Sequence, residues 1–174
     1  MFSGKTTKLV AMVNVFERMG FIVLTVKPAI DVRYSTKQEI HSHDHRTSSA
    51  LVINGETPEE IIEKILEDKP NKVILDEVQF FDKEKIIHVV QKLLKEKIHV
   101  IAAGLLYDYQ RKPFGATQDL LGLADERMEL FSVCQKCGSI ARHSERVRGN
   151  KSKIDVGAEN KYIAVCEHCH RIYR

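Results

Sequence analysis

The first six residues, MFSGKT, place the strongest constraint on how this chain can fold. Gly4, Lys5 and Thr6 are the closing half of the pattern G-x-x-x-x-G-K-[ST], a loop whose backbone N–H groups wrap phosphates at the start of a helix. In such a loop the lysine reaches the outer phosphates and the hydroxyl group ligates Mg²⁺. The first glycine of the pattern, and the strand that leads into the loop, would precede Met1. Because many unrelated chains contain G-K-T, the remaining sequence has to test this interpretation.

The apolar residues that follow alternate between helical and strand patterns, as an α/β fold with a parallel sheet requires. The predicted helices cover residues 5–19, 57–68, 82–96 and about 120–123. The predicted strands cover residues 21–26, 72–77, 98–103 and 129–133. Their near-continuous apolar character suits a sheet that is covered on both faces by helices. Residues 31–49 and 107–117 are polar and are predicted to be loops.

Composition and charge limit the class of protein. With 174 residues, of which 43% are hydrophobic, the chain can bury the core of one domain with a small appendage. The net charge of +3 is too small to indicate a nucleic-acid partner. No apolar run is long enough for a transmembrane helix, and lysines interrupt the segment where a signal peptide needs apolar residues. We therefore expect a cytoplasmic protein that binds neither membranes nor nucleic acid.

Two acidic residues end the predicted strand 72–77. An apolar strand ending in Asp, about 70 residues after G-K-T, is where a phosphate-loop enzyme keeps its Mg²⁺-coordinating carboxylate, and Asp76 fits. Ligands of open α/β sheets lie beyond the carboxyl ends of the strands, where Glu77 also falls. Glu77 could act there as a base on a hydroxyl group or position a water molecule. The alternative is that Asp76 only caps a turn, but the two motifs in this order favour the functional interpretation.

Four cysteines form two C-x-x-C pairs, Cys134 with Cys137 and Cys166 with Cys169. Two such pairs are typical of a tetrahedral zinc site, and four thiolates leave no open position, so the zinc is predicted to be structural. A redox C-x-x-C is the alternative, and the presence of a second pair argues against it. The interval between the pairs exceeds that of compact zinc ribbons, so the residues between them should form a long excursion.

The change of pattern at the first cysteine pair predicts a domain boundary near Ser132. Residues 1–132 would form the phosphate-binding α/β domain and residues 133–174 the zinc-binding domain. His168 and His170 lie beside the second pair and could replace a ligand, but four cysteines suffice.

Two loops carry further candidates. Residues 109–115 are basic and aromatic, and Tyr109 could stack on a base there, although a solvated turn explains the spacing equally well. Asp31 and Arg33 lie in the polar stretch 31–49, where arginine could bind phosphate, although an ordinary polar loop is the simpler interpretation.

Several short motifs of this chain also occur, in the same order along the sequence, in one known protein family. They are Met1-Phe2-Ser3-Gly4-Lys5-Thr6, Asp31-Val32-Arg33-Tyr34-Ser35, His43-Asp44, Asp76-Glu77-Val78-Gln79-Phe80-Phe81, Tyr109 with Pro113-Phe114-Gly115, and the two cysteine pairs. With these motifs the chain resembles the type II thymidine kinase family over essentially its whole length. The resemblance implies Mg²⁺-dependent transfer of the γ-phosphate of ATP to the 5′-hydroxyl of thymidine or deoxyuridine, in nucleoside salvage for DNA synthesis. It also implies a structural zinc ion, inhibition by dTTP and a homotetramer.

The resemblance implies a role for each matching residue. Glu77 would be the general base. The residues implied at the ATP and Mg²⁺ site are Met1, Phe2, Ser3, Gly4, Lys5, Thr6, Asp31, Arg33, Asp76 and Gln79. The residues implied at the nucleoside are Phe80, Leu105, Tyr109, Lys153, Ile154, Asp155, Val156, Gly157 and Tyr162, with Met1, Leu105 and Ser144 around the 5-methyl group. Residues 153–157 would belong to a lasso that closes over the base.

Two residues depart from the family pattern. Leu106 stands where the family usually has Asp, and Ala158 replaces a glycine of the lasso. Two other functions remain as alternatives at this stage. One is a different phosphate-loop ATPase, and the other is a zinc-ribbon protein that binds nucleic acid through Arg142, Arg146, Arg148, Lys151 and Lys153.

Overall fold

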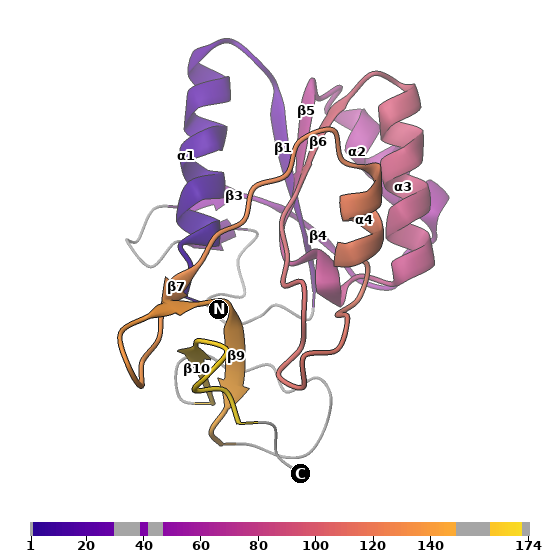
Figure 1. Cartoon of the computed structure of the whole chain (residues 1–174). Coiled ribbons are helices and arrows are strands. Elements are labelled where there is room, and N and C mark those ends of the chain that lie inside the picture. The colour runs from indigo at the N-terminus through magenta and orange to yellow at the C-terminus, as the bar shows by residue number, and fades with distance from the viewer. Residues whose placement is uncertain (1, 30–38, 42–46, 149–160, 172–174) are drawn as a thin grey trace.

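A parallel sheet forms the centre of the computed structural model, which describes residues 2–29, 39–41, 47–148 and 161–171 (Figure 1). Its strands are β1 (Val23–Pro28), β4 (Leu51–Ile53), β5 (Lys72–Leu75) and β6 (His99–Ala102). They lie in the order β4-β1-β5-β6, and every pairing between them is parallel. The predicted α/β class is therefore confirmed.

Helices cover both faces of this sheet (Figure 1). They are α1 (Lys5–Arg18), α2 (Pro58–Glu67), α3 (Lys83–Lys95) and the short α4 (Thr117–Leu123). Because successive side chains of a strand point to opposite faces, β5 supplies both layers. Ile74 packs with Leu9 and Val13 of α1, whereas Val73 and Leu75 belong to the cluster formed with α2 and α3.

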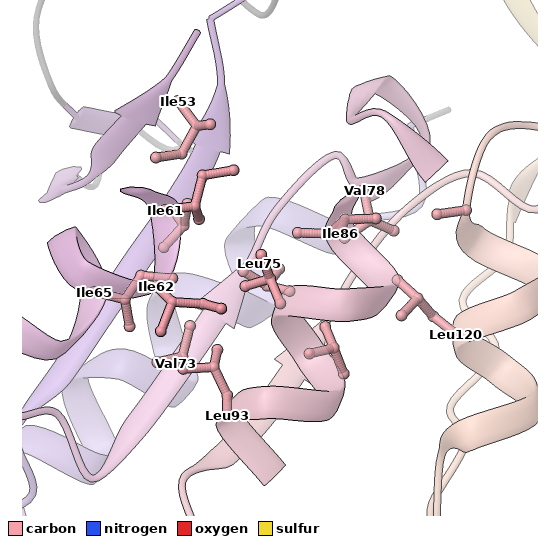
Figure 2. Packing of buried hydrophobic residues seen from close by; sticks show 14 of the residues in the cluster. Ile53, Ile61, Ile62, Ile65, Val73, Leu75, Val78, Ile86, Leu93 and Leu120 are labelled. Carbon is pink, nitrogen blue, oxygen red and sulfur yellow. The ribbon is translucent and has the colours of Figure 1, made fainter. Parts of the chain in front are cut away.

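The larger core lies between the sheet and the helices α2, α3 and α4, and Figure 2 shows most of it. Its branched aliphatic side chains are those that a buried parallel sheet favours. Burying each one stabilises the fold by about 1.5–3 kcal/mol relative to exposure. Members labelled in Figure 2 are Ile53, Ile61, Ile62, Ile65, Val73, Leu75, Val78, Ile86, Leu93 and Leu120.

The ladder of the sheet continues one step past the strand ends. The N–H group of Asp76 donates to the carbonyl of Val26 over 2.9 Å, and the N–H of Val78 donates to Ala103 over 3.0 Å. β5 and β6 therefore end level with each other, whereas β1 runs on from Val26, the partner of Leu75, to Pro28. Residues that follow these strands emerge at one edge of the sheet.

A smaller lobe follows residue 131. Strand β7 (Ser132–Val133) pairs antiparallel with β8 (Ile140–Ala141), and β9 (His143–Arg146) pairs antiparallel with β10 (Tyr162–Val165). This lobe has its own apolar cluster, against which Phe2 packs. The cluster consists of Cys134, Ala141, Ala164, Val165 and Cys166. The predicted domain boundary near Ser132 stays a prediction.

Two sequence predictions about strands need correction, and a strand of the parallel sheet was missed. The strand predicted over 129–133 is limited to β7, and it pairs with β8 instead of joining the parallel sheet. The stretch 31–49, predicted to be a loop, contains β2 (Glu39–His41) and β3 (Thr47–Ser49), which pair antiparallel. Strand β4 was not predicted. Each of these strands has two or three residues, too few for an apolar period to appear in the sequence.

Among the described residues, no helix combines the length and apolar character that a membrane span needs. The predicted start of α2 is confirmed in detail. The Thr57 side chain accepts the N–H of Glu60 over 3.2 Å, and the Glu60 carboxylate accepts the N–H of Thr57 over 2.7 Å. This capping box satisfies two backbone donors that the first helical turn leaves without partners.

We expect the substitution Thr57→Ala to lower the free energy of unfolding by about 1 kcal/mol, since it removes one half of the capping box. Urea denaturation followed by circular dichroism measures this change. Thr57→Ser keeps the hydroxyl group and should stay within about 0.5 kcal/mol of the parent. Equal stability of Thr57→Ala and the parent would contradict a stabilising cap.

Candidate active site and metal centre

The phosphate loop leads directly into α1. Gly4 occupies the N-cap position with φ of 73°, and Phe2 also has a positive φ of 60°. Glycine adopts this left-handed conformation without steric cost, and nothing lies within 4 Å of where a Cβ atom at Gly4 would be. Backbone conformation, and not crowding, is therefore the reason for glycine here. The loop delivers Lys5 to the first position of the helix.

Lys5 bonds to both predicted acids at the end of β5. Its ammonium group forms an ion pair with the Asp76 carboxylate and lies 3.0 Å from Oε1 of Glu77. Asp76 and Glu77 are only 4% and 9% exposed. This geometry brings Lys5, Asp76 and Glu77 together at the carboxyl end of β5, and their predicted roles stay predictions.

Burial and charge shift the titration of this cluster. Burial lowers the pKa of Lys5, but the neighbouring carboxylates of Asp76 and Glu77 outweigh it and hold the pKa above its ordinary value. Burial and the charge of Glu77 raise the pKa of Asp76, and the ammonium group of Lys5 opposes that rise. Lys5 is thus cationic at neutral pH and neutralises part of the acidic charge around it.

Gln79 holds the other oxygen of Glu77. Its Nε2 donates to Oε2 of Glu77, and its Oε1 accepts the N–H of Leu105 over 2.9 Å. Gln79 is 3% exposed, so this amide is fixed between β5 and the segment after β6. Glu77 itself has a left-handed φ of 53°, which is uncommon for a non-glycine residue. The predicted contact of Gln79 with ATP stays a prediction, because the hydrogen bonds of Gln79 neither support nor exclude it.

Two glycines leave room for Gln79. A Cβ atom at Gly104 would lie 2.7 Å from Oε1 of Gln79, and one at Gly115 would overlap the Gln79 backbone. Gly115 also has a positive φ of 57°. Gly115 was named from the sequence as part of a motif, but the contact of either glycine with Gln79 was not predicted, because a close approach of distant segments leaves no local pattern.

The predicted aromatic residues make two separate contacts. The ring of Phe80 packs edge-to-face on Phe114, with centroids 5.5 Å apart. Tyr109 and Tyr162 both lie against the guanidinium group of Arg146.

The loop that carries Tyr109 is shaped by a buried carboxylate. Oδ1 of Asp108 accepts the N–H groups of Gln110 and Lys112 over 2.8 and 2.9 Å, and Tyr107 forms a β-bridge with Pro113. A side chain that bonds its own backbone in this way fixes a turn. Asp108 was not predicted, although an Asp two residues before such donors is a recognisable turn signal.

The four cysteines converge as predicted. Their sulfur atoms all lie within 4.8 Å of one another, and the Sγ atoms of Cys137 and Cys166 are 3.6 Å apart. A tetrahedral Zn²⁺ with bonds of about 2.3 Å places its sulfur ligands roughly 3.8 Å apart, so the group fits zinc. This sulfur donor set is the one that zinc uses in closed structural sites.

The thiols titrate in a way that suits a metal ligand set. Burial raises the pKa of the Cys134 thiol, but backbone N–H groups of Cys166, Lys136 and Cys137 outweigh it and bring the pKa to about 6. Hydrogen bonds with the neighbouring thiols, first of all Cys137, raise the pKa of Cys169 to about 12. One thiolate therefore suppresses the ionisation of the next, and a divalent cation would relieve that repulsion.

An ion pair that the sequence did not reveal joins the two cysteine pairs. The ammonium group of Lys136 lies 2.6 Å from Oε1 of Glu145 and donates to the carbonyl of Cys169 over 3.0 Å. Oε2 of Glu145 accepts the N–H of Arg171 over 2.6 Å. Burial raises the pKa of Glu145, but these hydrogen bonds outweigh it and hold the pKa below its ordinary value.

Some predicted residues cannot be placed. The following lie outside the described residues: Met1, Asp31, Arg33, Lys153, Ile154, Asp155, Val156 and Gly157. Of the rest, Lys5, Asp76, Glu77 and Gln79 form one bonded group, which Leu105 joins through its backbone. Phe80 and Tyr109 make the separate contacts described above.

The geometry defines a class of protein. A lysine that opens a helix, facing acids at the carboxyl end of a parallel strand, is the arrangement of phosphate-loop α/β proteins, which bind nucleotides at this edge.

Sequence comparisons identify the family. The chain matches the family model described as Thymidine kinase over residues 1–170. It is 35% identical to a thymidine kinase of Mycoplasmoides gallisepticum, with 99% of this chain and 78% of that protein aligned. It is 32% identical to one of Mycoplasma mobile (98% and 82%) and 30% identical to one of Mesomycoplasma hyopneumoniae (99% and 91%). The chain therefore belongs to the thymidine kinase family, as its motifs indicated.

We expect the purified protein to contain one zinc ion per chain, and Cys166→Ser to lower that content, because three thiolates bind zinc more weakly than four. Elemental analysis of protein dialysed against a weak chelator measures the content. His168→Gln is the matched control, since His168 is exposed and outside the cysteine group. Unchanged zinc in Cys166→Ser, or a loss in His168→Gln, would refute the four-cysteine assignment.

Proposed function

We propose that this protein transfers the γ-phosphate of ATP to the 5′-hydroxyl of thymidine, and of deoxyuridine, giving the nucleoside monophosphate and ADP. The observation that carries the proposal is the placement of Glu77, a buried carboxylate beside the phosphate-loop lysine and fixed by Gln79. Phosphoryl transfer needs positioning, charge neutralisation and one proton acceptor at the nucleophile. Family membership favours this reaction over a different ATPase or a nucleic-acid-binding protein.

On the donor side, the residues of the loop hold the phosphates. Ser3, Gly4 and Thr6 would bind them through backbone N–H groups, and Lys5 would contact the outer phosphate oxygens. Magnesium, when bound, would neutralise phosphate charge, and the Thr6 hydroxyl group and Asp76 are the groups that would hold it. Phosphates also offer Lys5 a stronger partner than Glu77. Nucleotide binding would therefore free Oε1 of Glu77 to face the acceptor.

On the acceptor side, Glu77 would take the proton of the 5′-hydroxyl group. Gln79 bonds to Oε2 of that carboxylate, so Oε1 would be the oxygen that takes the proton. Fixing the base in one orientation contributes to rate because the reacting groups need not search for alignment.

The nucleoside would bind beyond Glu77, among residues from several segments. These are Phe80, Leu105, Tyr109, Tyr162 and the backbone of residues 153–157. The zinc ion, held by the four cysteines, would anchor both ends of the lasso. Inhibition by dTTP, a homotetramer and a cytoplasmic location are parts of the same proposal.

The first test is ADP formation from Mg-ATP with and without thymidine. We expect Glu77→Gln to lower kcat by at least about 100-fold, because the amide cannot accept the proton, while ATP affinity stays within a few-fold. A coupled ADP assay gives kcat, and calorimetry gives the affinity for ATP. Near-normal turnover of this variant would remove Glu77 from the role of base.

Gln79 is expected to affect the rate through Glu77. Gln79→Met keeps the side-chain volume but loses both hydrogen bonds, so kcat should fall about 10- to 100-fold. The acidic limb of the kcat–pH profile should also move to higher pH, because a hydrogen bond that stabilises the carboxylate is lost. Gln91→Met, on the exposed face of α3, is the control. An unchanged pH profile in Gln79→Met would argue against the positioning role.

A further inference from the structure

Arg146 is a buried cation that neither the motifs nor the proposed reaction accounts for. It is the last residue of β9 and is 6% exposed. Burying a charge is costly unless other groups compensate it. The groups that surround Arg146 therefore indicate what it is for.

Two of these groups are tyrosine rings from different segments. Cζ of Arg146 lies 3.9 Å from the ring centroid of Tyr109 and 5.1 Å from that of Tyr162. The first ring belongs to the loop after β6, and the second to β10. A guanidinium over an aromatic face is attracted by the negative charge of that face.

The orientation of Arg146 is fixed as well. Its Nε donates to the hydroxyl oxygen of Tyr162 over 3.0 Å, and Nη2 donates to the same oxygen. Tyr162 is also its partner in the β9–β10 register. The planar guanidinium uses two of its own N–H groups to bond to Tyr162. It cannot turn away from Tyr109 without losing both of these bonds.

Two more contacts join the loop of Tyr109 to the second cysteine pair. A ring nitrogen of His170, Nε2, lies 3.1 Å from the carbonyl oxygen of Tyr109. Nη2 of Arg111 donates to the carbonyl oxygen of Glu167 over 2.9 Å. The loop is therefore held against the residues that flank Cys169.

We propose that Arg146 is a positioning residue that holds the ring of Tyr109 ready to stack on the nucleoside base. This inference rests on the proposed function. The guanidinium covers one face of the ring, so the base stacks on the opposite face. Arg146 also connects the ring to β9 and β10, and hence to the metal centre, so the metal supports nucleoside binding through Tyr109 as well as through the lasso.

The physical effect is preorganisation. A tyrosine at the tip of a loop loses rotational freedom when a base stacks on it, and that loss weakens binding. A ring already held by Arg146 has lost this freedom before the nucleoside arrives. We expect the effect to fall on nucleoside binding, because Arg146 lies against Tyr109 and Tyr162, whereas Lys5 forms its ion pairs with Asp76 and Glu77.

The test compares Arg146→Met with Arg142→Met in the full-length, zinc-loaded protein. Arg142 is exposed, belongs to the same lobe and pairs with Glu129, so its removal controls for the loss of one positive charge. We expect Arg146→Met to raise KM for thymidine about 3- to 30-fold, the range that a cation–π contact supports. KM for ATP should change less than about twofold, and Arg142→Met should match the parent in both constants.

A second variant and a binding measurement keep the test decisive. If Arg146→Met does not fold, Arg146→Lys takes its place: it retains the charge without the planar group, and its KM for thymidine should exceed that of the parent. Calorimetry with thymidine alone should reproduce the same order of affinities.

Three outcomes would overturn the inference. They are an unchanged KM for thymidine in a folded Arg146→Met, an equal rise in both KM values, and an equal effect of Arg142→Met. A parent protein that neither phosphorylates nor binds thymidine would overturn the proposed function, and this inference with it. A parent that does both, with an Arg146→Met variant equal to it, would overturn this inference alone.

Discussion

The ammonium group of Lys5, held between Asp76 and Glu77, is the interaction on which the arrangement of the site depends. It joins residues 71 positions apart in the chain, at the first turn of α1 and the end of β5. Two adjacent buried carboxylates repel each other and lose hydration, so a cation must compensate them if both are to stay ionised. The same ammonium group is the one that the phosphate oxygens of a nucleotide would bind. Lys5 therefore supplies the positive charge that offsets these acids, and it is also the residue that nucleotide binding would redirect.

The parallel sheet makes this arrangement possible. Because β5 and β6 are parallel and end level, the segments after them meet at one edge, and Gln79 can bond to Leu105 there. The cysteine lobe makes two contacts with segments near this edge of the sheet. Phe2 packs on its apolar cluster just before the phosphate loop, and Arg146 stacks on Tyr109. A metal held by the four cysteines would therefore support the proposed donor and acceptor sides together.

The parts that could be predicted from the sequence are those that depend on residues close together in the chain. The capping box of α2 spans Thr57 to Glu60, and each cysteine pair spans four residues, so local rules suffice. Strand β4 and the β7–β8 pair were missed or misassigned because they are too short to show a period. The bond of Gln79 to Leu105 and the pairing of Lys136 with Glu145 join separate segments, and only the folded chain brings them together.

Glu77, and not its neighbour, is the better candidate for the base because of how the two carboxylates are occupied. One oxygen of Asp76 already accepts both the ammonium group of Lys5 and the N–H of Glu77, which directs that carboxylate toward the phosphate side. Glu77 divides its oxygens between Lys5 and Gln79. Its left-handed backbone costs on the order of 1–3 kcal/mol, and such strain persists only where surrounding contacts over-determine it. One of those contacts is the bond from Gln79 to Oε2 of Glu77, and that bond also orients the base.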